Sequence, residues 1–173
     1  MKTVCFTGHR PEKLNFEDGD EKYMQFKAVL LKVLNRLHEL GYTRFISGMA
    51  RGFDMWAAET VCSMREKEEN VSLVCAVPFP SQAKSWCIDE KTRWQSILNT
   101  ADETVMVCDK YTRDCFHRRN RYMVDNSHAV VCLYDGTKGG TAYTVDYALK
   151  KGKFVIQINP QTLEVTLLSK EQI

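Results

Sequence analysis

The stretch Ala129-Val130-Val131-Cys132-Leu133-Tyr134-Asp135-Gly136-Thr137-Lys138-Gly139-Gly140-Thr141 joins an apolar run to a glycine-rich turn, and a helical pattern follows. The apolar run predicts a buried strand, and the glycines allow the backbone to approach a ligand closely because they carry no Cβ. The amino end of a helix adds free amides and partial positive charge. This segment is therefore typical of a phosphate-binding connection between a strand and a helix.

A second glycine-bearing turn, Ser47-Gly48-Met49-Ala50-Arg51-Gly52-Phe53-Asp54, follows the apolar pair Phe45-Ile46. Neither turn contains the Gly-Lys-Ser/Thr of a Walker loop or the Gly-x-Gly-x-x-Gly spacing of a dinucleotide fold, so kinase and hydride-transfer functions lack their hallmark. A tight connection in which glycine only relieves crowding is the alternative at each turn. Two such turns in one chain favour a nucleotide-type ligand.

Apolar runs alternate with helix-length segments along the whole chain. Strands are expected at 3–6, 44–46, 71–77, 104–108, 129–133 and 154–158, all buried, and the tail 163–167 adds a short edge strand. Helices are expected at 21–40, 52–68, 81–99 with Ser81 as N-cap, 115–126 and 141–151. This alternation predicts an α/β fold, a single doubly wound domain over residues 1–173 with a mainly parallel sheet flanked by helices.

Composition excludes several classes of protein. The 24 basic and 22 acidic side chains give a net charge of +2, so no global field implies nucleic acid as the partner. The seven cysteines include no pair at the two-residue gap of metal sites, and we expect Cys5, Cys75, Cys108 and Cys132 to pack as reduced thiols inside strands. No signal peptide and no membrane-spanning apolar run are evident, so we expect a cytoplasmic protein without a membrane partner.

The carboxyl ends of parallel strands share one rim of the sheet, where α/β proteins bind ligands. Two kinds of group lie at this rim. Arg10 suits bidentate contact with a phosphate, and His9 beside it suits proton transfer; the alternatives are a surface arginine and a histidine with a single structural hydrogen bond. Asp54 and Asp135 are the carboxylates for a sugar hydroxyl or a water, although Asp54 is equally suited to capping a helix.

A basic patch at 113–122 interleaves arginines with aromatic side chains, which also suits stacking on a base. On a helix Arg118 and Arg121 share a face, whereas Arg119 points elsewhere, and a solvated helix face is the alternative. Trp86 follows Pro78-Phe79-Pro80 near the rim and is a further candidate for stacking. Packing in the core is the alternative for this tryptophan.

Four segments in this order, 7–11, 47–54, 119–125 and 135–141, make the sequence resemble the YpsA-like group of the SLOG superfamily. That superfamily also includes the LOG cytokinin-activating phosphoribohydrolases and the DNA-processing protein A family. The resemblance covers nearly the whole chain. It implies a Rossmann-like domain that binds nucleotides or nucleotide-derived small molecules, often as an oligomer.

One position departs from the LOG pattern. LOG enzymes continue their glycine turn as Gly-Thr-x-x-Glu, with the glutamate assigned to hydrolysis, whereas Thr144 stands at that place here, and Tyr134 and Asp135 stand roughly where LOG enzymes have leucine and proline. Arg119 or Arg121 can stand for the helix arginine of the family. The resemblance therefore implies that the phosphate part of the site is kept and the catalytic part is not.

The leading hypothesis is a binding module for a nucleotide-like ligand, with or without Mg²⁺, that forms a homo-oligomer and has no evident resident cofactor or metal site. One alternative is a phosphoribohydrolase or N-glycosidase that uses Asp135 or Asp54. The other is a module that binds single-stranded DNA through the basic patch, and we do not favour nucleic acid as the partner. The expected binding residues are Gly8, His9, Arg10, Ser47, Gly48, Gly52, Asp54, Arg119, Arg121, Asp135, Gly136, Gly139, Gly140 and Thr141.

Overall fold

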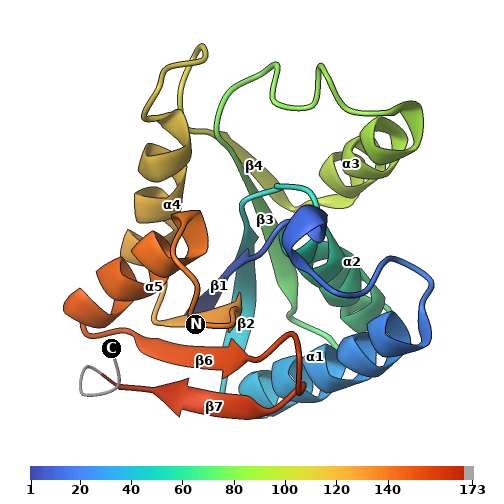
Figure 1. The fold of residues 1–173 in the computed structure, drawn as a ribbon, viewed down its shortest axis with the longest axis vertical. Helices are drawn as coiled ribbons and strands as arrows, with labels where there is room; N and C mark the ends of the chain where they lie inside the picture. The colour runs from blue at the N-terminus through green and yellow to red at the C-terminus, as the bar shows by residue number, and fades with distance from the viewer. Residues whose placement is uncertain (170–173) are drawn as a thin grey trace.

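The computed structural model describes residues 1–169, and its strands form one seven-stranded sheet with helices on both faces (Figure 1). Residues 170–173, the end of the expected domain range, lie outside the described part. The strands are β1 (Lys2–Gly8), β2 (Tyr42–Ser47), β3 (Ser72–Val77), β4 (Glu103–Met106), β5 (Ala129–Leu133), β6 (Phe154–Ile158) and β7 (Val165–Leu168). Their order in the sheet is β4-β3-β2-β1-β5-β6-β7. All neighbouring pairs are parallel except β6 and β7, so the expected fold class is confirmed.

The helices divide between the two faces of the sheet (Figure 1). Helices α1 (Glu21–Glu39), α2 (Phe53–Arg65) and α3 (Ile88–Thr100) cover one face, and α4 (Cys115–Asp125) and α5 (Gly140–Lys150) cover the other. A short 3-10 helix, η1 (Pro11–Lys13), follows β1. Within residues 1–169 no helix combines the length and apolarity that crossing a membrane requires.

Because helices cover both faces, the central strands bury both sets of alternating side chains. In β1, Phe6 packs with Phe45 and Phe53 under α1 and α2, whereas its neighbour Cys5 packs with Val130 under α4 and α5. This burial explains why these strands show no polar face in the sequence. Cys5, Cys75 and Cys132 are buried free thiols inside strands as expected, whereas Cys108, also a buried free thiol, lies two residues beyond the end of β4. Burial raises the pKa of Cys5 and Cys75 to about 12.

Two expectations about the fold are wrong. The helix expected at 81–99 with Ser81 as N-cap is α3, which begins only at Ile88, because residues 79–86 form successive turns closed by short-range bonds such as Gln82 N–H to Phe79 C=O, 3.1 Å. The strand expected to be buried at 104–108 is β4, an edge strand whose side chains are mostly exposed. The tail strand does occur, as the antiparallel edge strand β7.

The strand order creates a switch point between β1 and β5. The chain moves outward from β1 through β2 and β3 to β4, then crosses the sheet and continues from β5 in the opposite direction. The loops after β1 and β5 therefore leave the sheet side by side but toward opposite faces, and a crevice opens between them. The His9 amide donates to the Leu133 carbonyl across this point at 3.1 Å.

Candidate functional site

A cleft of about 460 Å³ lies at the switch point, beyond the carboxyl ends of β1, β2 and β5. It is lined by Thr7, Gly8, His9, Arg10, Glu12, Lys13, Ala50, Asp54, Phe116, His117, Arg119, Asn120, Gly140 and Thr141. The lining brings together the loop after β1, the turn after β2, one side of α4 and the start of α5. These segments are far apart in the sequence and meet only because of the strand order.

The first turn of α5 presents free backbone amides at this cleft. Gly139 is the N-cap residue, with φ 150°, and no side chain caps the helix. Gly139 and Gly140 are exposed, whereas Thr141 is buried. A Cβ built on Gly140 would meet no atom of the described chain within 4 Å, apart from its chain neighbours and its own helix backbone. Lys13 lies close by, since its Nζ donates to the Lys138 carbonyl at 3.3 Å. Amides and an ammonium group thus converge at one end of the cleft, a combination that suits an anion.

The loop after β1 contributes Gly8, His9 and Arg10. Gly8 is needed for packing, because a Cβ there would lie 2.5 Å from the ring of Phe53. Arg10 is exposed, and its guanidinium lies 5.7 Å from the ring centroid of Phe116. Among residues 1–169, no carboxylate forms an ion pair with Arg10. Its charge therefore remains available to a ligand.

His9 and Asp135 form a pair behind the cleft. His9 is buried, and its Nε2 lies 2.7 Å from Asp135 Oδ1, which also accepts from the amide of Thr137 at 3.0 Å and from its hydroxyl at 2.7 Å. Although burial opposes it, these hydrogen bonds and His9 hold the pKa of Asp135 below its usual range. Asp135 does not line the cleft itself, so it contacts a ligand only through His9.

The depressed pKa of Asp135 predicts a pH-dependent loss of stability in Asp135→Asn. At pH 7 the variant should unfold about 1 kcal/mol more easily, because an amide accepts these hydrogen bonds more weakly than a carboxylate. Below about pH 4, the ordinary range of an aspartate, the Asp135 carboxylate of the unfolded wild-type chain takes up a proton, whereas in the folded chain its lower pKa keeps it ionised. The stability that this carboxylate contributes is therefore lost progressively, and the difference should shrink as pH falls further. Urea unfolding from pH 3 to pH 7 measures this. The control is Asp146→Asn, which should stay near wild type throughout because Asp146 is partly exposed and pairs only with the exposed Lys150 among the ion pairs of residues 1–169. A difference that stays constant across this range would contradict the assignment.

Beneath the cleft, Asp54 and Arg119 form a buried pair, with side chains each 6% exposed and Arg119 Nη1 3.6 Å from Asp54 Oδ2. Burial raises the pKa of Asp54, and Arg119 and the Ala50 amide oppose this shift. Burial likewise lowers the pKa of Arg119, against the effect of Asp54. The guanidinium stays charged, because an arginine pKa lies far above neutrality. Arg119 Nη1 also donates to the Gly48 carbonyl, so it holds the turn after β2 in place.

The turn after β2 is closed by its own side chains. The Ser47 hydroxyl donates to the Asp54 carbonyl at 2.8 Å and accepts from the Met49 amide at 3.1 Å. A Cβ on Gly48 would lie 2.7 Å from Asp54 Oδ2, and Gly52 has φ 80° with its Cβ position 2.8 Å from Pro11 Cδ. Ser47, Gly48 and Gly52 therefore shape the rim from behind and do not line the cleft.

Thr144, at the place of the LOG glutamate, is 1% exposed. Its hydroxyl accepts from Asn120 Nδ2 at 2.9 Å and donates to the Gly140 carbonyl at 2.9 Å. Asn120 in turn accepts from Arg119 Nε at 2.8 Å. This chain of hydrogen bonds ties α4 to the first turn of α5, so Thr144 positions the glycine turn and offers no carboxylate for hydrolysis.

Three further expected residues are not among those that line the cleft: Gly139, which precedes the lining residue Gly140, and Arg121 and Gly136, which lie apart from it. Arg121 is exposed on α4, its Nε donates to the Tyr143 hydroxyl at 2.7 Å, and its guanidinium lies 5.8 Å from the Tyr143 ring centroid. Gly136 is exposed in the turn after β5, with φ 90°. Lys13 and Asn120 also line the cleft, although neither was predicted from the sequence as a binding residue. Asn120 could have been found from its place directly beside Arg119, whereas Lys13 carried no signal in the sequence.

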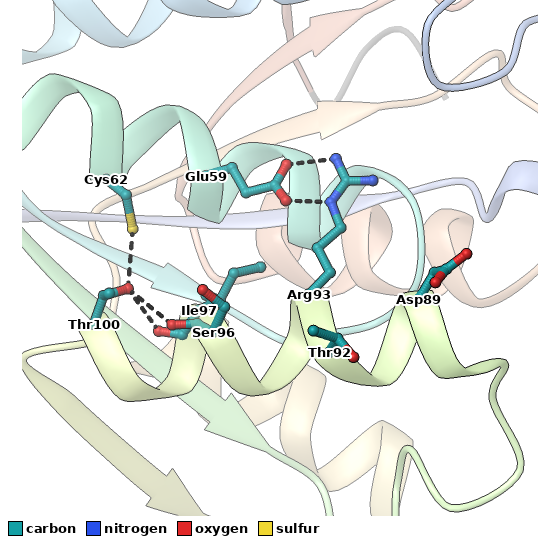
Figure 2. Close-up of a pocket in the computed structure, with 8 residues that line it drawn as sticks. All are labelled: Glu59, Cys62, Asp89, Thr92, Arg93, Ser96, Ile97 and Thr100. Atoms are coloured by element: carbon teal, nitrogen blue, oxygen red, sulfur yellow. Dashed lines mark hydrogen bonds and ion pairs between the residues drawn. The ribbon is translucent and has the colours of Figure 1, made fainter.

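A second hollow, of about 520 Å³, lies between α2 and α3 (Figure 2). Two of its charged groups are paired with each other: Arg93 Nη2 donates to Glu59 Oε2 at 2.6 Å, and Arg93 also binds Asp18. The third charged residue of the lining, Asp89, is exposed. In Figure 2 the guanidinium and the Glu59 carboxylate face each other as two parallel contacts. These ion pairs hold α3 against α2, so this hollow has a structural role.

Comparison with known proteins identifies the family. The family model YpsA, described as the YspA SLOG family, matches residues 4–163. The chain belongs to this SLOG family. The resemblance found in the sequence is thereby confirmed.

Two SLOG relatives have similar lengths. The chain is 36% identical over 141 residues to the uncharacterized SPbeta prophage-derived protein YoqJ of Bacillus subtilis (strain 168), covering 73% of this chain and 82% of that protein. It is 29% identical over 157 residues to a UPF0398 protein of Bacillus cereus (strain B4264), covering 88% of this chain and 85% of the relative.

Solved structures share the SLOG fold at low sequence identity. DNA processing protein A (DprA) from Streptococcus pneumoniae matches with a TM-score of 0.64 at 15% identity, over 94% of this chain and 52% of that one. The SLOG chain therefore spans about half the length of that protein. DprA from Helicobacter pylori matches with a TM-score of 0.61 at 16% identity, over 95% of this chain and 68% of that one. The description of the latter structure concerns its single-stranded DNA binding mode.

Proposed function

We propose that this SLOG domain binds a nucleotide or nucleotide-derived small molecule in the cleft at the switch point, with its phosphate on the turn Gly139-Gly140-Thr141. The single observation that carries the proposal is the setting of Gly140. It is exposed at the start of a helix, and among residues 1–169, apart from its chain neighbours and the backbone of its own helix, no atom lies within 4 Å of the place a Cβ would occupy. Packing does not require glycine there, whereas close approach of a ligand to the backbone does.

The charges around the cleft support an anionic ligand. Arg10 lies at the rim without a carboxylate partner among residues 1–169, and Lys13 lies beside Gly139. The acidic lining residue Glu12 is paired with Arg51, so it opposes an anion less than a free carboxylate would. Phe116 adds an aromatic surface to the same cleft, which suits a base or a ribose.

A thermal-shift panel of nucleoside mono-, di- and triphosphates, ADP-ribose, NAD and cyclic nucleotides tests the proposal, each with and without Mg²⁺. We expect at least one nucleotide to raise the melting temperature in a concentration-dependent manner, because a ligand that binds only the folded state stabilises it. Inorganic phosphate and the free nucleosides are the controls for the two halves of the ligand. A panel in which no nucleotide acts would contradict the proposal.

Hydrolysis of the N-glycosidic bond is the second candidate, and the pair His9 and Asp135 favours it. A histidine that lines the cleft and is held by a carboxylate behind it is an arrangement that suits a general base. Chromatography of each ligand after incubation measures release of the free base. Release of the free base by the wild type, lost in the Asp135→Asn variant, would support a hydrolase. A nucleotide that stays intact after incubation would favour the binding module instead.

The likeness to the DprA structures carries a third candidate, binding of single-stranded DNA through the exposed Arg118 and Arg121 of α4. It predicts affinity that falls steeply with salt. A fluorescent oligonucleotide titrated at 50 and 200 mM salt tests this, and absence of binding at the lower concentration would end it. We further propose that the protein is cytoplasmic and forms a homo-oligomer. Sedimentation velocity of the purified protein measures the oligomeric state.

A further inference from the structure

A smaller hollow of about 200 Å³ adjoins the proposed nucleotide cleft. It is lined by Arg10, Ala50, Arg51, Gln82, Ser85, Trp86 and Phe116. Three of these residues, Arg10, Ala50 and Phe116, also line the cleft. A ligand whose phosphate lies on the turn at Gly140 therefore has this hollow as a neighbouring compartment.

Within residues 1–169, two buried side-chain atoms of the lining residues have no hydrogen-bond partner, Gln82 Oε1 and Arg51 Nε. Arg51 Nε lies 2.8 Å from a carboxylate oxygen of Glu90, so Gln82 Oε1 is the acceptor left for a ligand. Gln82 is 7% exposed, and its Nε2 donates to the Met49 carbonyl at 3.0 Å. A carbonyl only accepts hydrogen bonds, so the nitrogen end of the amide must face Met49, and this fixes which end is the oxygen. Among residues 1–169, Oε1 is buried and has no hydrogen-bond partner. A buried acceptor without a donor is unfavourable, and a ligand that supplies an N–H removes that penalty.

The remaining lining suits a flat ring better than a phosphate. Trp86 and Phe116 contribute aromatic surface, and Trp86 is supported edge-on by Trp94 with ring centroids 6.4 Å apart. Arg51 is neutralised by Glu12 and by Glu90, whose Oε1 lies 2.8 Å from its Nε. Aromatic side chains stack on the face of any base and do not distinguish one base from another. Selectivity between bases therefore has to come from a polar atom.

We infer that this hollow is the base subsite and that Gln82 Oε1 accepts a hydrogen bond from an exocyclic amino group of the base. The subsite therefore selects nucleotides whose base carries such an amino group, as adenine does. The inference rests on the proposed function, because it needs a nucleotide in the adjoining cleft. On this inference, Gln82 determines which bases the subsite accepts. The carbonyl of Met49 positions Gln82, since it orients the amide.

The test compares AMP with purine riboside 5′-monophosphate, which differs from AMP only by lacking the amino group. Isothermal titration of the wild-type protein should show about tenfold tighter binding of AMP, the effect of one hydrogen bond to a buried acceptor. In Gln82→Met, which keeps the length of the side chain, AMP should weaken to the affinity of the purine riboside nucleotide, whose own affinity stays unchanged. The exposed Lys84→Met is the matched control and should keep the tenfold preference.

The outcomes separate the two proposals. If both nucleotides bind the wild type equally, the base subsite is wrong while the nucleotide cleft stands, and this result needs no variant. If neither binds at millimolar concentration, the adenine subsite is wrong, and the proposed function fails with it only if no other nucleotide of the thermal-shift panel binds either. A preference for AMP that survives in Gln82→Met would also overturn the assignment of Gln82.

Discussion

Gly140→Leu should strongly weaken nucleotide binding while leaving the folded protein at least as stable as the wild type. The side chain would project from the first turn of α5 into the space where the phosphate lies in the proposed complex. Outside its own helix backbone and its chain neighbours, no atom of residues 1–169 lies within 4 Å of its Cβ position. Replacing glycine in a helix also reduces the entropy lost on folding, so the melting temperature should stay or rise. Loss of the charge-assisted amide contacts should weaken binding by about 10- to 100-fold.

A graded series makes this prediction specific. Gly140→Ala adds only the Cβ and should weaken binding less than leucine, while both variants keep their helical circular dichroism. Isothermal titration with the tightest nucleotide from the panel measures the affinities. A leucine variant that binds as well as the wild type would place the phosphate elsewhere.

Arg119→Met should lower the free energy of unfolding by about 3–5 kcal/mol, the typical effect of leaving a buried charge without its partner. Asp54 would lose the guanidinium 3.6 Å away, and the Gly48 carbonyl would lose a donor. Arg121→Met, two residues along the same helix, removes an exposed arginine and should change stability by less than about 1 kcal/mol. Urea unfolding of the two variants at pH 7 gives the comparison.

The pH dependence of Arg119→Met identifies the cause. Burial raises the pKa of Asp54 in the folded state, so the folded protein favours the neutral acid and gains stability relative to the unfolded chain as pH falls. Without Arg119 this effect grows, and the deficit of the variant should narrow between pH 7 and about pH 4, the ordinary range of an aspartate. The double variant with Asp54→Asn should also be more stable than Arg119→Met alone. A deficit independent of pH and of Asp54 would mean that Arg119 acts only by packing.

The sheet was predictable because its signal is local. Strands buried on both faces appear as continuous apolar runs, and β5 and β6 begin and end at the predicted residues. Edge strands lose that signal, as β4 shows with its exposed side chains. The start of α3 was missed because residues 79–86 form consecutive turns, and periodicity alone does not separate these from a helix.

The candidate site was predictable in its position and less so in its chemistry. Glycine turns after predicted strands placed Gly8, Gly140 and Asp54 at one rim, and all three line the cleft. The sequence did not distinguish the buried Arg119 from the exposed Arg121, because that difference depends on the turn after β2 packing against α4. The unpaired oxygen of Gln82 was likewise invisible, since it follows from a contact with Met49 that lies 33 residues away.

The central claim is that a nucleotide phosphate lies on the turn at the start of α5. Titration of AMP, ADP and ADP-ribose into ¹⁵N-labelled protein, followed by two-dimensional NMR, tests it most directly. We expect the largest shifts at the amides of Gly139, Gly140 and Thr141, with smaller shifts at Arg10 and around Gln82. Shifts confined to the hollow between α2 and α3, or no shifts with any of these nucleotides, would contradict it.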